Sequence, residues 1–89
     1  MKVVHCKKDS YDVYIGRPSK WCNPYSLAKY TREEAIDLYR KHLHNQLRMG
    51  RITKEDLLSL DGKTLGCWCK PLPCHGDVIV SAVEWAKRK

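Results

Sequence analysis

The sequence lacks any run of the roughly 20 consecutive apolar residues that a membrane-spanning helix requires. Its first residues, MKVVHCKK, are basic but contain neither the apolar h-region nor the small-residue cleavage site of a secretory signal. There is also no internal repeat, no low-complexity tract and no linker. We therefore expect a single domain over residues 1–89 that is located in the cytoplasm and does not bind a membrane.

Acidic residues are scarce, with 10 Asp and Glu against 17 Lys and Arg, which gives a net charge of +7. Such an excess of positive charge favours anionic partners, and nucleic acid or nucleotide phosphates rank before membrane surfaces among them. The hydrophobic fraction of 43% is too high for a disordered chain and is ordinary for a globular one. The composition thus predicts a folded basic domain with a nucleotide or nucleic acid as its partner.

The chain has five cysteines, at positions 6, 22, 67, 69 and 74. An odd number would leave one thiol unpaired in a disulfide framework. In a reducing compartment, clustered cysteines more often bind a metal or act in catalysis than form disulfides. The three cysteines at positions 67, 69 and 74 lie close together in the sequence and are therefore the candidates for such a site.

Three segments have the apolar spacing of amphipathic helices. Steps of three and four predict a helix over residues 32–49, preceded by a capping box from Thr31 to Glu34. A shorter, leucine-rich helix is expected after Thr53. The last helix is predicted over residues 77–87, where valine, isoleucine and alanine form one face.

Three shorter segments have the composition of strands, and they cover residues 1–6, 12–15 and 64–69. The element order is then β-β-α-α-β-α. We expect the last strand to pair with the first two in a sheet of three strands or slightly more, with the helices on one or both faces. The predicted fold class is α/β (or α+β) in one small domain.

The densest chemistry lies in the segment GCWCKPLPCHGDV. Side chains two apart on a strand share a face, so Cys67 and Cys69 would present their thiols together while Trp68 faces the other way. The prolines should return Cys74 and His75 to the end of the strand. Cys74 would then lie at a helix N-terminus, where backbone N–H groups and the helix dipole lower the pKa of a thiol.

Three interpretations of this segment remain open. In the first, it binds zinc, which favours tetrahedral sulfur and nitrogen ligands; the ligands would be Cys67, Cys69, Cys74 and His75. In the second, Cys74 or Cys69 is a reactive thiolate, with His75 or His5 as its base and Asp77 as orienter or general acid/base; the first-choice catalytic residues are Cys74, His75 and Asp77. In the third, the cysteines are small buried apolar residues and the histidine bonds to backbone.

A second loop, residues 16–24, offers groups that could hold a phosphate and a base. Its candidate ligand-binding residues are Gly16, Arg17, Ser19, Lys20, Trp21 and Asn23. Glycine and serine let the backbone approach an anion, basic side chains hold phosphate, and the indole can stack on a base. The spacing is not that of a P-loop. The alternative is a solvated turn with its tryptophan packed on the core.

The position of these two segments predicts a shared site. If strands 12–15 and 64–69 are neighbours, the loop and the cysteine segment leave the same edge of the sheet. In α/β folds, ligand clefts lie at that carboxyl edge of the strands.

The motifs GRPSKW-x-NP and GCWC-x-P-x-x-CHGDV resemble a bacterial and bacteriophage family, domain of unknown function 4326. Residues 31–39 are similar to the stretch between its motifs. That family has glycine where this chain has Cys22, so Cys22 is a poor candidate for a shared ligand. The resemblance implies that the two motifs form one site and that the chain comes from a phage or mobile element, acting in the host cytoplasm. It implies no reaction.

Three functions follow as hypotheses. We favour binding of a phosphate-bearing ligand, nucleotide or nucleic acid, at a site that joins loop 16–24 to segment 67–77. The second is a small enzyme for a nucleotide-like substrate, which requires Asp77 inside a pocket between the motifs. The third is an interaction protein that binds a host protein through an exposed patch away from the cysteines. The spacing completes no catalytic constellation, so the sequence does not decide whether the chain is an enzyme.

Overall fold

The structure, a computed structural model, describes residues 1–16, 19–25, 28–68 and 74–88. Its strands are β1 (Lys2–His5), β2 (Val13–Tyr14) and β3 (Thr64–Cys67). Its helices are α1 (Arg32–Arg48), α2 (Lys54–Leu58) and α3 (His75–Arg88). The order of these elements is β-β-α-α-β-α, and the predicted α/β fold class with a three-stranded sheet is confirmed.

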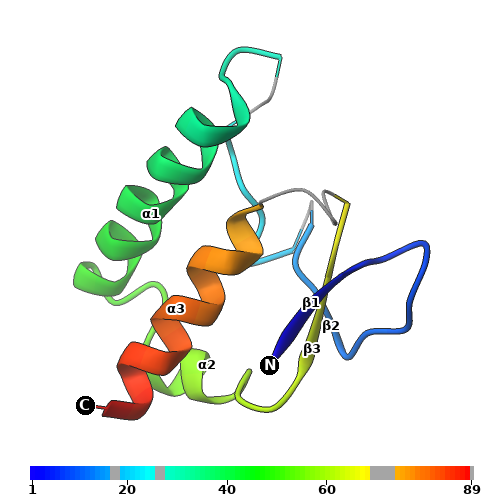
Figure 1. The fold of residues 1–89 in the computed structure, drawn as a ribbon. Helices are drawn as coiled ribbons and strands as arrows, with labels where there is room; N and C mark the ends of the chain where they lie inside the picture. The colour runs from blue at the N-terminus through cyan, green and yellow to red at the C-terminus, as the bar shows by residue number, and fades with distance from the viewer. Residues whose placement is uncertain (17–18, 26–27, 69–73, 89) are drawn as a thin grey trace.

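β3 is the central strand, and β1 and β2 both pair with it in parallel. Val3 of β1 and Val13 of β2 both lie opposite Leu65, which is fully buried. Because all three strands run the same way, their carboxyl ends meet at one edge of the sheet, the upper edge in Figure 1. The chain leaves β2 and β3 there, and α3 begins there.

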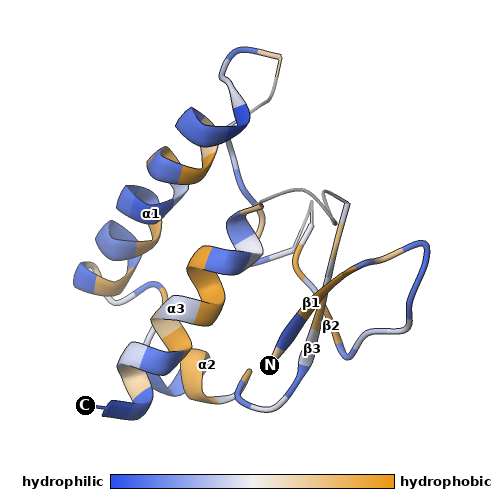
Figure 2. Cartoon of the chain, in the orientation of Figure 1, coloured by the Kyte–Doolittle hydropathy of each residue, from blue (hydrophilic) through white to orange (hydrophobic). Residues whose placement is uncertain are grey.

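The three helices lie to one side of the sheet, with α3 between the sheet and α1 (Figure 1). α3 is the more buried of the two long helices, because Ile79 and Val83 are both fully enclosed. α1 is hydrophobic toward α3 and hydrophilic on its outer side (Figure 2), as the spacing predicted. Its buried residues are Ala35, Tyr39 and Leu43. None of the helices among the described residues is both long and apolar enough to cross a bilayer.

Two helices begin at the side-chain caps that the sequence predicted. The Thr31 hydroxyl accepts a hydrogen bond from the Glu34 backbone N–H, and the Glu34 carboxylate accepts one from the Thr31 N–H. Thr53 and Asp56 form the same reciprocal pair at α2. These caps satisfy backbone donors that a helix cannot satisfy internally, and they fix both helix starts.

Some boundaries differ from the sequence-based expectation. α3 begins two residues early because the Asp77 carboxylate accepts a hydrogen bond from the Cys74 backbone N–H, 3.2 Å away, which extends the helix back to His75. β2 is shorter than predicted, although the Asp12 and Ile15 N–H groups still donate to carbonyls of β3. β3 ends at Cys67, so the predicted strand over residues 64–69 is too long at Trp68, and residue 69 lies outside the described residues.

Gly76 provides a test of how closely α3 packs on the sheet. A Cβ at this position would lie 2.8 Å from Val3 Cγ1 and 2.9 Å from Ile15 Cδ1. Alanine is favoured over glycine in a helix by about 1 kcal/mol, so any loss of stability must come from this contact. We expect Gly76→Ala to lower the free energy of unfolding by about 1 kcal/mol or more in urea denaturation.

The matched control is Ser81→Ala, at an exposed position of the same helix, which should change stability by no more than about 0.5 kcal/mol. If Gly76→Ala is at least as stable as the wild type, α3 has room to shift, and its contact with Val3 and Ile15 is not tight.

Candidate functional site

The two motifs adjoin each other at the carboxyl edge of the sheet. Tyr14 of β2 pairs with Gly66 of β3, so the chain leaves both strands at the same edge. His75 Nε2 lies 2.9 Å from the Ile15 carbonyl oxygen, which joins the start of α3 to the end of β2. The indole N–H of Trp68 donates to the Tyr14 hydroxyl at 2.7 Å. The residues after β2 and those after β3 are therefore in direct contact.

Cys67 and Cys74 lie side by side beneath this edge. Their Sγ atoms are 3.1 Å apart, and both residues are buried. The hydrogen bond with Cys67 and burial raise the pKa of the Cys74 thiol, and they outweigh the backbone N–H of Gly76 that acts in the opposite direction. The expectation that the helix N-terminus lowers this pKa is therefore wrong. At neutral pH Cys74 is a thiol and a weak nucleophile.

His75 points into the core and not toward solvent. The residue is 7% exposed, and its ring packs edge-on against Tyr39 with the centroids 4.8 Å apart. Burial is the main cause that lowers the pKa of His75, so the imidazole is neutral at pH 7. Its Nε2 is engaged with the Ile15 carbonyl oxygen, and the backbone of Trp21 is a second hydrogen-bond partner of the imidazole.

Asp77 is exposed and occupies a capping position. Its carboxylate accepts the hydrogen bond from the Cys74 backbone N–H, while the Cys74 and His75 side chains are buried. Of the predicted zinc ligands, Cys69 lies outside the described residues. Among the residues that are described, no three histidine, cysteine or acidic side chains are grouped so that they could hold a metal ion.

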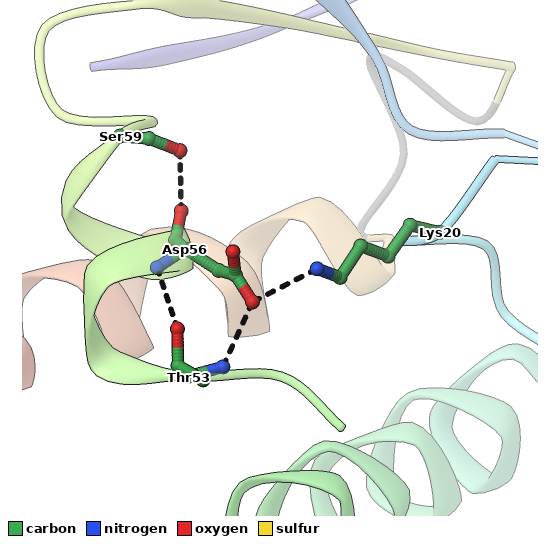
Figure 3. A network of polar contacts seen from close by, with 4 residues as sticks. All are labelled: Lys20, Thr53, Asp56 and Ser59. Carbon is green, nitrogen blue, oxygen red and sulfur yellow. Dashed lines mark hydrogen bonds and ion pairs between the residues drawn. The ribbon is translucent and has the colours of Figure 1, made fainter. Parts of the chain in front are cut away.

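The loop after β2 is anchored to α2 by Lys20. Its ammonium group lies 2.8 Å from Asp56 Oδ2, and the same oxygen accepts the Thr53 backbone N–H (Figure 3). The Ser59 hydroxyl donates to the Asp56 carbonyl, which holds the following turn. The hydrogen bond from Lys20 is the first cause that lowers the pKa of Asp56. This ion pair engages the ammonium group that was predicted to bind phosphate.

Other predicted ligand residues of this loop also have structural contacts. Trp21 is 7% exposed, so its ring packs in the core. Its backbone carbonyl accepts a hydrogen bond from the buried Tyr39 hydroxyl. Asn23 Oδ1 accepts the backbone N–H of Tyr25, which closes a local turn. The predicted stacking by Trp21 would require this ring to leave the core.

The remaining predicted residues of the loop are Gly16, Arg17 and Ser19. A Cβ on Gly16 would collide with the outer end of the Tyr14 ring, so a larger residue at this position would displace that ring. Arg17 lies outside the described residues. Ser19 Oγ is buried and has no hydrogen-bond partner in the described part of the chain, so its hydroxyl remains available for a ligand.

Exposed aromatic rings at this edge come from residues that the sequence analysis did not assign to the site. Leu65 and Cys67 point into the core, so the intervening Gly66 faces the opposite side of the sheet. A Cβ on Gly66 would lie 2.6 Å from the Tyr11 ring, which therefore covers that side. Tyr14 is paired with Gly66 and shares its face.

Trp68 extends this surface at the end of β3, and its ring is open to solvent. The residue is 54% exposed, and Lys7 Nζ lies 5.4 Å from its ring centroid. His5 packs edge-on against it with the centroids 5.8 Å apart. We call Lys7, Tyr11, Tyr14 and Trp68 the aromatic face. The alternation of β3 indicated the orientation of Trp68, but no pattern in the sequence placed Lys7 or Tyr11 beside it.

A family model described as "Domain of unknown function (DUF4326)" matches residues 2–85. The chain belongs to the DUF4326 family. The family resemblance inferred from the two motifs is thereby confirmed. This DUF4326 chain is also 43% identical over 83 residues to the "Uncharacterized 12.4 kDa protein in nrdA-td intergenic region" of Enterobacteria phage T4, covering 93% of the chain and 77% of the phage protein. No solved structure matches it.

Burial of His75 makes the stability of this DUF4326 domain depend on pH. Because the folded-state pKa lies below the ordinary value of about 6.5, the unfolded chain binds the proton more readily. The stability that the neutral His75 contributes is therefore fully present above about pH 6.5 and is lost as the pH falls below that value. We expect urea unfolding to show a loss of stability as the pH falls below about 6.5, with a slope of at most about 1.4 kcal/mol per pH unit, the limit for one proton.

His75→Gln should reduce this loss, whereas His44→Gln, at an exposed position, should leave it intact. A His75→Gln variant that loses stability with pH as steeply as the wild type would assign the effect to another group.

The raised pKa of Cys74 predicts slow thiol chemistry at neutral pH. Cys6 is only half-buried, so we expect an aromatic disulfide reagent to modify it about tenfold faster than Cys67 or Cys74. The measurement is the time course of thiolate release for the wild type and for single Cys→Ser variants, with a chelator present to remove bound metal. If Cys74→Ser removes the fastest phase, Cys74 is an activated thiol and the catalytic interpretation gains support.

Proposed function

We propose that this DUF4326 chain binds a phosphate-bearing ligand, single-stranded nucleic acid or a nucleotide, on the aromatic face. The observation that carries the proposal is the exposed Trp68 ring, fixed by its hydrogen bond to Tyr14 at the contact between the two motifs. One base would stack on Trp68, and its phosphate would meet the ammonium group of Lys7.

Trp68 is suited to stacking because its N–H is already satisfied. With the donor held 2.7 Å from the Tyr14 hydroxyl, the indole has a fixed orientation before any ligand arrives. Binding therefore costs little side-chain freedom. A base stacked on an aromatic side chain contributes about 1–3 kcal/mol, and every base can do so. This supports a site that tolerates different base sequences.

Lys7 brings positive charge to the Trp68 ring, with its Nζ over the ring and 5.4 Å from the centroid, and this ammonium group would shift off the ring to pair with the phosphate of a stacked nucleotide. Its backbone N–H donates to His5 Nδ1 at 3.1 Å, which holds the turn beside Trp68. The net charge of +7 adds a general attraction for polyanions that weakens with salt. Ser19 and Arg17 remain proposed phosphate ligands of the neighbouring loop, the first on the strength of its unused hydroxyl oxygen.

The test is fluorescence anisotropy of labelled single-stranded oligonucleotides at low salt. We expect Trp68→Ala to weaken binding by about fivefold or more, the loss of one stacked base. Lys7→Ala should weaken binding less, and it should reduce the slope of log affinity against log salt by about 0.7, the value for one phosphate on a single strand.

The matched controls are Trp85→Ala and Lys63→Ala, which remove an exposed tryptophan and an exposed lysine elsewhere. Both should bind like the wild type. Absence of binding to any single strand, or a Trp68→Ala variant with unchanged affinity for oligonucleotides and free nucleotides, would contradict the proposal.

Zinc is a separate proposal for the buried sulfur pair. Cys67 and Cys74 place two sulfur atoms together, and Cys69 is the third thiol of the motif. Elemental analysis of protein purified without chelator tests it directly, and protein that contains no stoichiometric metal would contradict it.

A further inference from the structure

A groove with a volume of about 610 Å³ lies between α1 and α3, on the helical side of the fold. Its floor is aliphatic and is formed by residues from both helices, namely Leu43, Leu47, Val78 and Ala82. Because the helices lie on one side of the sheet (Figure 1), this groove is separate from the aromatic face on the other side.

One rim of the groove is basic. Arg40, His44 and Arg48 follow one another at steps of four on α1, so they lie on one side of the helix, and all three are exposed. They span about 12 Å along the helix axis, a little over two turns. Neither arginine forms an ion pair with any of the described residues, and the groove lining contains no acidic side chain.

The other helix contributes an exposed tryptophan. Trp85 lines the groove from α3 and is 40% exposed, although its neighbour Ala86 is buried in the core. Tryptophan and arginine, with tyrosine, are enriched among the energetic anchors of protein interfaces. The groove therefore combines an apolar floor, a cationic rim and an aromatic anchor, and nothing in the described chain covers it.

We propose that this groove binds an acidic amphipathic helix of a partner protein. Apolar side chains at positions i, i+3 or i+4, and i+7 of that helix fill the floor, as in other helix-in-groove complexes. Carboxylates beside them pair with Arg40 and Arg48, whose guanidinium groups favour bidentate contacts. The aliphatic floor offers successive bases no stacking platform apart from Trp85, so the chemistry fits a protein segment and not a nucleic acid.

The experiment selects binders from a displayed library of random 14-residue peptides on the full chain. We expect the enriched peptides to carry an excess of Asp and Glu, with apolar residues at helical spacing. Selected peptides are then measured by fluorescence anisotropy. Trp85→Ala and Arg48→Glu should each weaken binding by about tenfold or more, and Ser81→Glu, which adds a negative charge to the groove lining, should weaken it as well.

Lys63→Glu is the matched charge reversal outside the groove and should leave peptide affinity unchanged within about twofold. Trp68→Ala, on the aromatic face, should also leave it unchanged. Circular dichroism confirms that each variant is folded.

The proposal is overturned if the library yields no binder or if the enriched peptides lack an acidic excess. It is also overturned if Lys63→Glu weakens binding as much as Arg48→Glu, or if single-stranded oligonucleotide displaces the peptide from the wild type but not from Trp85→Ala. These outcomes do not depend on nucleotide binding at the aromatic face, which the Trp68→Ala variant measures separately.

Discussion

The contact between the Ile15 carbonyl oxygen and the His75 imidazole ties the sheet to the helix that covers it. Ile15 is fully buried, Gly76 packs against its side chain, and the imidazole fills the space between the end of β2 and Tyr39. Burial also raises the pKa of Tyr39, so its hydroxyl remains a donor to the Trp21 carbonyl oxygen. Two hydrogen bonds, joined by the ring contact between the neutral His75 and Tyr39, therefore hold α1, α3 and the loop after β2 together.

This junction explains why many residues of the two motifs have packing and hydrogen-bonding roles inside the fold. Lys20, Trp21 and Asn23 hold the loop to α2, the core and α1, whereas Cys67, Cys74 and His75 fill the space beneath the edge of the sheet. The solvent-facing chemistry is on the opposite side, where Gly66 leaves room for an aromatic ring. Residues that define a family motif and residues that line the exposed aromatic face are thus partly different sets.

The sequence predicted the features that depend on local spacing. The capping boxes and the steps of three and four located α1 and α2, and the carboxyl edge shared by β2 and β3 followed from treating their segments as neighbouring strands. Local patterns could not show that Lys20 pairs with a residue 36 positions away, or that Trp21 turns inward. The direction of the Cys74 pKa was missed for the same reason, because it depends on a sulfur atom seven residues away that only the fold brings close.

The shortness of the outer strands has a consequence for association between copies. β2 is two residues long and β1 four, so the sheet presents few free backbone donors and acceptors along either border. Open borders of longer sheets act as templates on which another chain can add a strand and begin to aggregate. The short borders of this sheet therefore give a second copy little backbone on which to add a strand, even though aromatic rings are exposed on the sheet.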